Sequence, residues 1–285
     1  MRFFFILSLF FVTFNAQALD SSGRLLLTSG VTQIEGAAGG GLTPWAFIGG
    51  YGTRDQIGAS AYYTNVAISD YHLESTGALI GFYDRVEFSV ARLTFDTQKI
   101  GALLGLGADY KIKQYVYGIK VKVLGDGVLD QASWLPQISV GAQYKKNQEG
   151  DVVRSVGAED DAGIDYYVSA TKIFLAQSLL ANVTLRRTKA NQLGILGFGG
   201  DEEESHTFQF EGSLAYLLTR QVALGAELRQ KPNNLGVADE DDWSDVFVAW
   251  APTKNLSLTA AYTMLGNIVL RDDQGGFYTS LQLGF

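Results

Sequence analysis

The 285-residue sequence contains no cysteine, two methionines, two histidines and four prolines. Without cysteine, neither a disulfide framework nor a thiolate metal site is available. The mean hydropathy of +0.06 is too low for a helical membrane protein, whereas a β-barrel with a polar lumen and an apolar outer belt averages near that value. A net charge of −8 disfavours nucleic acid as a partner, because little here would neutralise phosphates. We expect no metal site and no cofactor.

One long apolar run is present, at the start of the chain. Met1-Arg2 gives a short positive region, Phe3 to Phe14 an apolar core, and Ala16-Gln17-Ala18 a small-residue cleavage site. The run is too short to span a membrane as a helix, so it predicts a secretory signal peptide over residues 1–18. Residues 19–285 then form the mature, exported protein.

The last ten residues, 276–285, alternate in character. Such a segment has the length of a strand that crosses a bilayer at a tilt, and it ends on Phe285. It resembles the C-terminal signal of Gram-negative outer-membrane β-barrels. The resemblance implies that the barrel-assembly machinery reads this strand through Tyr278, Leu281, Leu283 and Phe285.

Two-residue alternation continues through most of the mature chain and excludes a helical fold. It predicts an all-β protein: one transmembrane, antiparallel, up-and-down β-barrel of about fourteen strands, the first two over Arg24–Glu35 and Trp45–Gly52. Twelve strands is the alternative if residues 24–52 fold inward. Short turns at 53–55, 84–85, 219–220 and 252–254 are expected at the periplasmic end and longer loops outside.

Acidic clusters all fall in the long connections, at 159–161, 201–204, 239–242 and 272–273. They would therefore share the outer rim of the barrel. Carboxylates there could bind divalent cations that bridge lipopolysaccharide phosphates, but they lack the spacing of a dedicated calcium loop. A solvated, repulsive rim is the favoured interpretation. Outer-membrane lipid and lipopolysaccharide are the expected surroundings, and the sequence leaves the oligomeric state open.

Several stretches together resemble one uncharacterised family of bacterial outer-membrane proteins, a domain of unknown function. They include G-R-L-L-L-T at 23–28, Q-I-E-G-A-A-G-G-G-L-T-P-W-A at 33–46 and V-A-W-A-P-T-K at 248–254. The resemblance covers nearly all of the mature chain. It implies an outer-membrane barrel and transfers no activity.

Charged residues on the polar faces of the strands are the first candidate site. If the apolar faces meet lipid, these charges must point into the lumen, because a charge on the lipid face is costly. They would set the selectivity of a pore or pair across the lumen and fill it. The residues are Lys120, Lys122, Lys145, Arg186, Glu211, Glu227 and Arg229.

The glycine-rich stretch 36–44 is the second candidate. Glycine permits close backbone approach, so this segment would fold into the lumen as a constriction or form a flexible outer loop. The constriction residues would be Glu35, Gly39, Gly40 and Trp45.

Catalysis is not expected. The two histidines, His72 and His206, lie near loop ends, and no spacing demands a converging nucleophile and base. The sequence predicts a porin-like passive channel for small solutes. The alternatives are a closed structural or adhesive barrel and a channel for hydrophobic compounds or exopolysaccharide.

Overall fold

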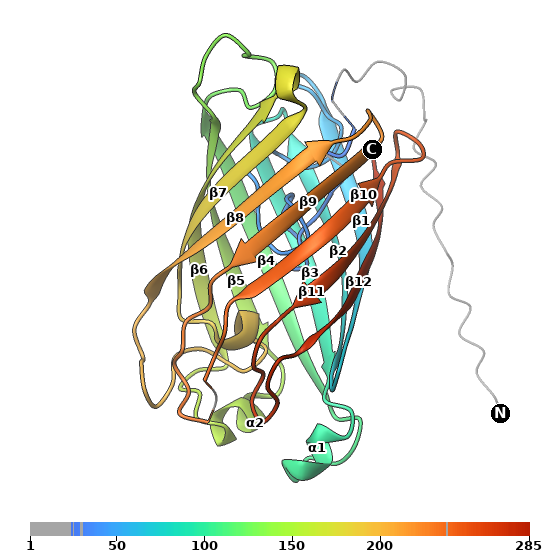
Figure 1. Cartoon of the computed structure of the whole chain (residues 1–285). Coiled ribbons are helices and arrows are strands. Elements are labelled where there is room, and N and C mark those ends of the chain that lie inside the picture. Colours follow the sequence, from blue (N-terminus) through green and yellow to red (C-terminus); the bar gives the residue numbers. More distant parts are fainter. Residues whose placement is uncertain (1–23, 25, 29–30, 238) are drawn as a thin grey trace, which may run out of the picture.

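A computed structural model describes residues 24, 26–28, 31–237 and 239–285. The predicted signal peptide lies outside these residues. Within them, twelve antiparallel strands form a closed barrel (Figure 1). The strands are β1 (Ile57–Ile68), β2 (His72–Phe82), β3 (Val86–Asp96), β4 (Lys111–Leu124), β5 (Gln137–Asn147), β6 (Ala162–Phe174), β7 (Leu179–Thr188), β8 (Thr207–Leu217), β9 (Val222–Arg229), β10 (Trp243–Trp250), β11 (Leu256–Met264) and β12 (Gly275–Gly284).

Each strand pairs with its neighbours in sequence, and β1 closes the barrel against β12. At this seam Thr64 lies opposite Ser280. The terminal residue completes it, because the Phe285 backbone exchanges hydrogen bonds with Ala59 in both directions. The topology is therefore up-and-down, as the alternation predicts.

The main expectation of fourteen strands is wrong, and the alternative of twelve is confirmed. The described residues of Arg24–Glu35 and all of Trp45–Gly52 do not form wall strands; every residue from 31 to 50 is buried. A wall strand buries only every second residue, because its side chains point alternately to lumen and lipid. We call residues 31–50 the plug. Figure 1 shows this blue segment inside the barrel.

The wall follows the two-residue rule. In β3 the side chains of Phe88 and Val90 are exposed outward, while Glu87 and Ser89 are buried toward the lumen. In β6 Tyr166 and Val168 face out and Asp165 faces in. Apolar side chains thus form the outer face and polar side chains the inner one, as a barrel in a bilayer requires.

The two ends of the barrel differ. The short helices α1 (Ile100–Leu103) and α2 (Gly150–Ser155) and all four acidic clusters lie in connections at one end, which we call the long-loop end (Figure 1). The opposite, short-turn end carries one exception to the expected pattern, the extended connection 125–136 between β4 and β5. Two 3₁₀ turns complete the structure, η2 (Leu175–Gln177) and η3 (Asn191–Gly194).

Within the part of the chain that the structure describes, no helix has the length and apolar character needed to cross a membrane.

The β7–β8 connection also enters the barrel. Residues 190–200, which include η3, are buried throughout. We call them the cap, because they fill the lumen from the long-loop end while the plug fills it from the other. The core of the barrel is therefore made of two inserted segments and the inner wall.

A charged substitution on the outer face of the wall tests whether that face meets lipid and at what depth. Val168→Arg, at the middle of β6, should lower the free energy of unfolding by roughly 2–4 kcal/mol, because the guanidinium would meet hydrocarbon. Phe208→Arg, at the long-loop end of β8, is the matched control and should cost about 0–1 kcal/mol. Denaturant unfolding in lipid vesicles measures both; equal losses would contradict the depth assignment.

Candidate functional site in the plugged lumen

The plug is a compact insertion whose two ends lie at the short-turn end. Near its start, the Arg24 guanidinium donates to the carbonyls of Ile48 at 2.9 Å and Gly50 at 2.8 Å and pairs with Asp84 in the β2–β3 turn. Just after the plug, the Tyr51 amide donates to the Phe285 carbonyl at 2.8 Å. The plug therefore enters and leaves the barrel through the same opening.

Wall side chains satisfy the plug's backbone on one side of the lumen. The Pro44 carbonyl accepts hydrogen bonds from Ser169 at 3.1 Å and Thr184 at 2.9 Å. The Ala46 carbonyl accepts from Gln137 at 2.6 Å and Ser139 at 2.5 Å. Because an unpaired buried carbonyl is costly, these polar wall residues form a specific seat rather than a generic filling.

Six buried charged side chains form a closed ring of ion pairs across the lumen. Five come from the consecutive strands β5 to β9 and one comes from the plug. Cations and carboxylates alternate, and none of these side chains is more than 4% exposed. In order the members are Glu35, Lys145, Asp165, Arg186, Glu211 and Arg229, which we call the charge ring.

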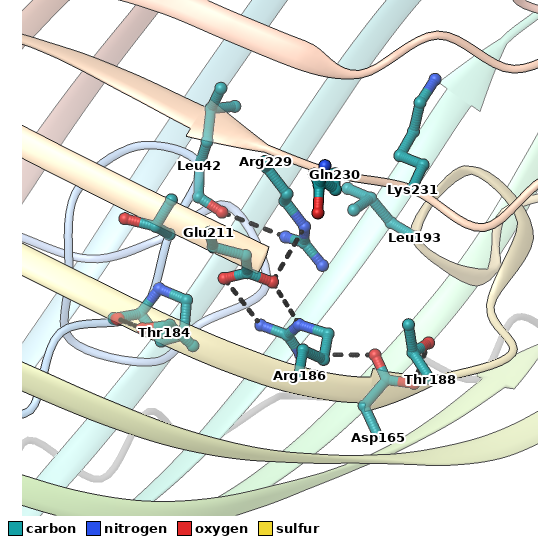
Figure 2. Close-up of polar contacts among 12 residues, drawn as sticks. Leu42, Asp165, Thr184, Arg186, Thr188, Leu193, Glu211, Arg229, Gln230 and Lys231 are labelled. Atoms are coloured by element: carbon teal, nitrogen blue, oxygen red, sulfur yellow. Dashed lines mark hydrogen bonds and ion pairs between the residues drawn. The ribbon is translucent and has the colours of Figure 1, made fainter. Parts of the chain in front are cut away.

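The wall part of the charge ring is held by carboxylates shared between cations. Asp165 lies 2.6 Å from Lys145 and 3.3 Å from Arg186. Glu211 contacts Arg186 and lies 3.4 Å from Arg229. Figure 2 shows Arg186 between the two carboxylates, with Arg229 reaching from Glu211 to the plug carbonyl of Leu42 at 3.0 Å.

Glu35 closes the charge ring from the plug. One of its carboxylate oxygens contacts Lys145, and the other lies 2.7 Å from the Arg229 guanidinium. The Gln33 amide also donates to it at 3.1 Å. Without Glu35 the wall holds three cations and two carboxylates at this level, so the plug carboxylate neutralises one positive charge of the wall.

A separate ion pair, outside the charge ring, contacts the plug nearer the short-turn end. Lys120 lies 3.0 Å from Glu87, and both side chains are buried. Lys120 donates to the plug carbonyls of Ala38 at 3.0 Å and Phe47 at 2.7 Å, while Glu87 accepts from the Gly49 amide at 2.7 Å. Lys122 lies 2.6 Å from Asp84 at that end.

Glu227 is the third contact point for the plug. Its carboxylate accepts from the Leu42 amide at 2.8 Å and from the hydroxyls of Thr43 and Ser213, each at 2.7 Å. A Cβ on Gly40 would lie 2.0 Å from this carboxylate, so glycine is required for the approach. Asp245 stands opposite Glu227 in the sheet, with one oxygen lacking a hydrogen-bond partner among the described residues.

The cap meets the charge ring from the long-loop end. The Leu193 carbonyl accepts from Gln114 at 2.9 Å and from Lys145 at 3.2 Å. Lys145 therefore contacts plug, wall and cap together. Beyond β9, burial lowers the pKa of Lys231 although its ammonium lies 2.8 Å from Glu240.

A pocket of about 330 Å³ opens at the short-turn end beside Phe47, Asp84 and Gln137, but deeper in the lumen the cavities between the inserted segments and the wall are small. A cavity of about 30 Å³ lies beside Gly40, Trp45 and Phe247, and another of about 20 Å³ beside Gln192 and Trp243. Each has room for little more than a water molecule. In this arrangement of the described residues the barrel is closed to solutes.

The structure places the predicted residues as follows. The seven lumen candidates are all buried on the inner wall, and Glu35, Gly39, Gly40 and Trp45 lie in the plug. Tyr278 faces the lumen, whereas Leu281, Leu283 and Phe285 face outward. His72 contacts Asn65, and His206 contacts the Ile164 carbonyl. Among the described residues, no group of three or more histidine or carboxylate side chains has the arrangement of a metal site.

Sequence reasoning missed three carboxylates that pair with the predicted lumen cations: Asp84, Glu87 and Asp165. Asp165 alternates with the outward residues Ile164 and Tyr166, so the same rule that selected Lys145 would have found it. Glu87 likewise lies between Val86 and Phe88. The sequence carries no signal for which cation each carboxylate contacts, because the partners are on other strands.

The fold is that of outer-membrane porins. The structure of the KdgM porin matches with a TM-score of 0.50 and 11% identity, over 79% of this chain and 99% of that one. The NanC porin matches with a TM-score of 0.51 and 11% identity, over 80% and 98%. Outer membrane phospholipase A from Escherichia coli matches with a TM-score of 0.45 and 10% identity, over 83% and 94%. A comparison with curated proteins found no match.

The chain belongs to the family described as "Protein of unknown function (DUF3034)", which matches residues 28–282. The family agrees with the resemblance of the sequence to an outer-membrane domain of unknown function and assigns no activity. That the chain is not an enzyme stays a prediction.

Loss of the Glu35 charge should release the plug. Removing one partner of a buried ion pair typically costs about 3–5 kcal/mol, because the other charges stay buried without compensation. Since the chain has no cysteine, Ala37→Cys gives a single reporter in the plug, where Ala37 is 1% exposed. Adding Glu35→Gln should speed its labelling by a water-soluble maleimide at least about tenfold, the equivalent of about 1.4 kcal/mol.

Two controls accompany this measurement. Ala108→Cys, in the exposed β3–β4 connection, should be labelled rapidly in every background. Glu202→Gln, which removes an exposed carboxylate at the long-loop end, should leave labelling of Ala37→Cys slow. Equal labelling of the reporter with and without Glu35 would show that the charge ring does not hold the plug.

Proposed function

We propose that the protein is a porin-type channel of the outer membrane that is closed by its own plug and cap and conducts small solutes when the plug withdraws and the cap moves aside. The observation that carries this proposal is the charge ring, because one of its six members belongs to the inserted segment and five to the wall.

The chemistry of the seat supports a reversible closure. Replacing buried ion pairs by apolar side chains is often neutral or stabilising, so ion pairs are a poor way to fill a lumen permanently. Charged and hydroxyl groups, in contrast, can be hydrated when the plug leaves. Both ends of the plug lie at the short-turn end, so it can withdraw without passing through the barrel.

A permanently closed structural barrel is the second candidate. The observation that favours it is the apolar part of the plug: Leu42, Trp45 and Phe47 are buried in the same core cluster as wall residues. Withdrawal would expose these side chains to a water-filled lumen. The cap would also have to move, since it fills the other end.

The cellular setting belongs to the same proposal. The mature chain would be exported with its signal peptide removed, its C-terminal strand read by the assembly machinery, and its outer face surrounded by lipid and lipopolysaccharide. The strands' apolar outer face supports this setting.

A reversible crosslink between plug and wall tests the proposal. The hydroxyl oxygens of Thr43 in the plug and Ser213 in β8 lie 2.5 Å apart, so Thr43→Cys with Ser213→Cys should form a disulfide. In planar bilayers the wild-type mature protein should show stepwise openings. The oxidised double variant should lose them, and reduction should restore them, because only the disulfide prevents withdrawal.

The matched control is a pair within the wall. Thr64 and Ser280 face each other across the β1–β12 seam with their hydroxyl oxygens 2.8 Å apart. Thr64→Cys with Ser280→Cys should conduct whether oxidised or reduced. A folded wild-type protein that never opens, and that stays silent with Glu35→Gln, would instead establish the closed structural barrel.

A further inference from the structure

The charge ring leaves a defined vacancy when the plug withdraws. Its wall part consists of five side chains, one from each of β5 to β9; the first and the last are cations, and the five together carry one net positive charge. The two terminal cations, Lys145 and Arg229, are the ones that contact Glu35. We call these two side chains the carboxylate clamp.

The geometry of the clamp suits a single carboxylate. Lys145 and Arg229 approach opposite oxygens of the Glu35 carboxylate. Hydrogen bonds between ionised partners are short and strong, and those at buried positions are the strongest. On the wall, Asp165 lies 2.6 Å from Lys145, and Glu211 lies 3.4 Å from Arg229. These contacts position both cations before any ligand binds.

We infer that the clamp binds the carboxylate of a small organic anion and that Glu35 occupies this site in the closed state as a built-in competitor. The inference rests on the proposed function, because the site is reached only when the plug is out. A solute carboxylate in the clamp then excludes Glu35 and keeps the plug out of the lumen, since a ligand that binds only the form with the plug withdrawn shifts the population toward that form.

The rest of the seat indicates what the anion carries besides its carboxylate. Thr184 lies opposite Glu211, which lies opposite Arg229, so its hydroxyl is near the clamp. It donates to the Pro44 carbonyl in the closed state and loses that acceptor when the plug leaves. Ser169, its hydrogen-bond partner at 2.7 Å, loses the same acceptor. Glu227 and Asp245 lie opposite each other on the neighbouring inner wall, where a second anionic group would meet carboxyl groups and no cation. The site therefore fits a monocarboxylate whose remaining part bears neutral hydroxyl groups.

Competition between a solute and Glu35 can be measured on the full mature chain. The reporter is Ala37→Cys in lipid nanodiscs, labelled by a water-soluble maleimide in potassium chloride, in potassium glucuronate of equal ionic strength, or in chloride with added glucose. Glucuronate should speed labelling by about tenfold in a saturable manner, the equivalent of about 1.4 kcal/mol. Glucose should have no effect.

Variants of the clamp identify the site. Adding Lys145→Met should make labelling fast and insensitive to glucuronate, because half the clamp is gone. Lys145→Arg keeps the charge and should retain the response, which guards against a variant that merely fails to fold. If Ala37→Cys with the wild-type clamp were labelled at the same rate in glucuronate, glucose and chloride, the inference would be overturned. A glucuronate response that persists unchanged in Lys145→Met would overturn it as well.

Conductance of the same samples separates the two proposals. A glucuronate response without current would leave the clamp established and the channel function wrong. Stepwise current without a glucuronate response would leave the channel established and the clamp wrong.

Discussion

The cost of taking charge out of water governs the inside of this barrel. Five charged side chains project from consecutive strands into a lumen that two inserted segments fill, and their charges do not cancel. The carboxylate of Glu35 supplies the missing charge, and its position requires the plug to sit at one depth and in one orientation. The hydroxyl and amide contacts to Pro44 and Ala46 then follow from that placement.

The fold alone would suggest an open pore. Barrels of this shape include the KdgM and NanC porins, yet a likeness at 11% identity concerns the wall and not what lies inside it. Here the distinguishing features are the plug and the cap. They are irregular segments, and they convert an inner wall of polar side chains from a water-lined surface into a binding surface for the chain's own backbone.

The wall can be predicted from sequence because each residue's side of the sheet follows from its parity along a strand. That rule alone places Lys145, Arg186 and Arg229 inside the barrel. It also assigns two surplus strands in residues 24–52, because alternation over a short irregular stretch does not distinguish a wall strand from a compact insertion buried on all sides. The parity rule does not predict the ion pairs, because they depend on strand register and join residues as distant in sequence as Glu35 and Arg229.

The seam between β1 and β12 has a consequence for assembly. The plug precedes every strand in the chain, yet its contacts extend to the last one: the Gln282 side chain in β12 hydrogen-bonds the Thr32 backbone, and the Phe285 carbonyl accepts from the Tyr51 amide just after the plug. The plug can therefore complete its contacts only after β12 has joined the barrel. A register slip of one residue in any of β5 to β9 would turn that strand's member of the charge ring toward lipid. The plug would then lose its matching contacts with the wall. Docking of the plug therefore requires the correct register of these strands and a closed barrel.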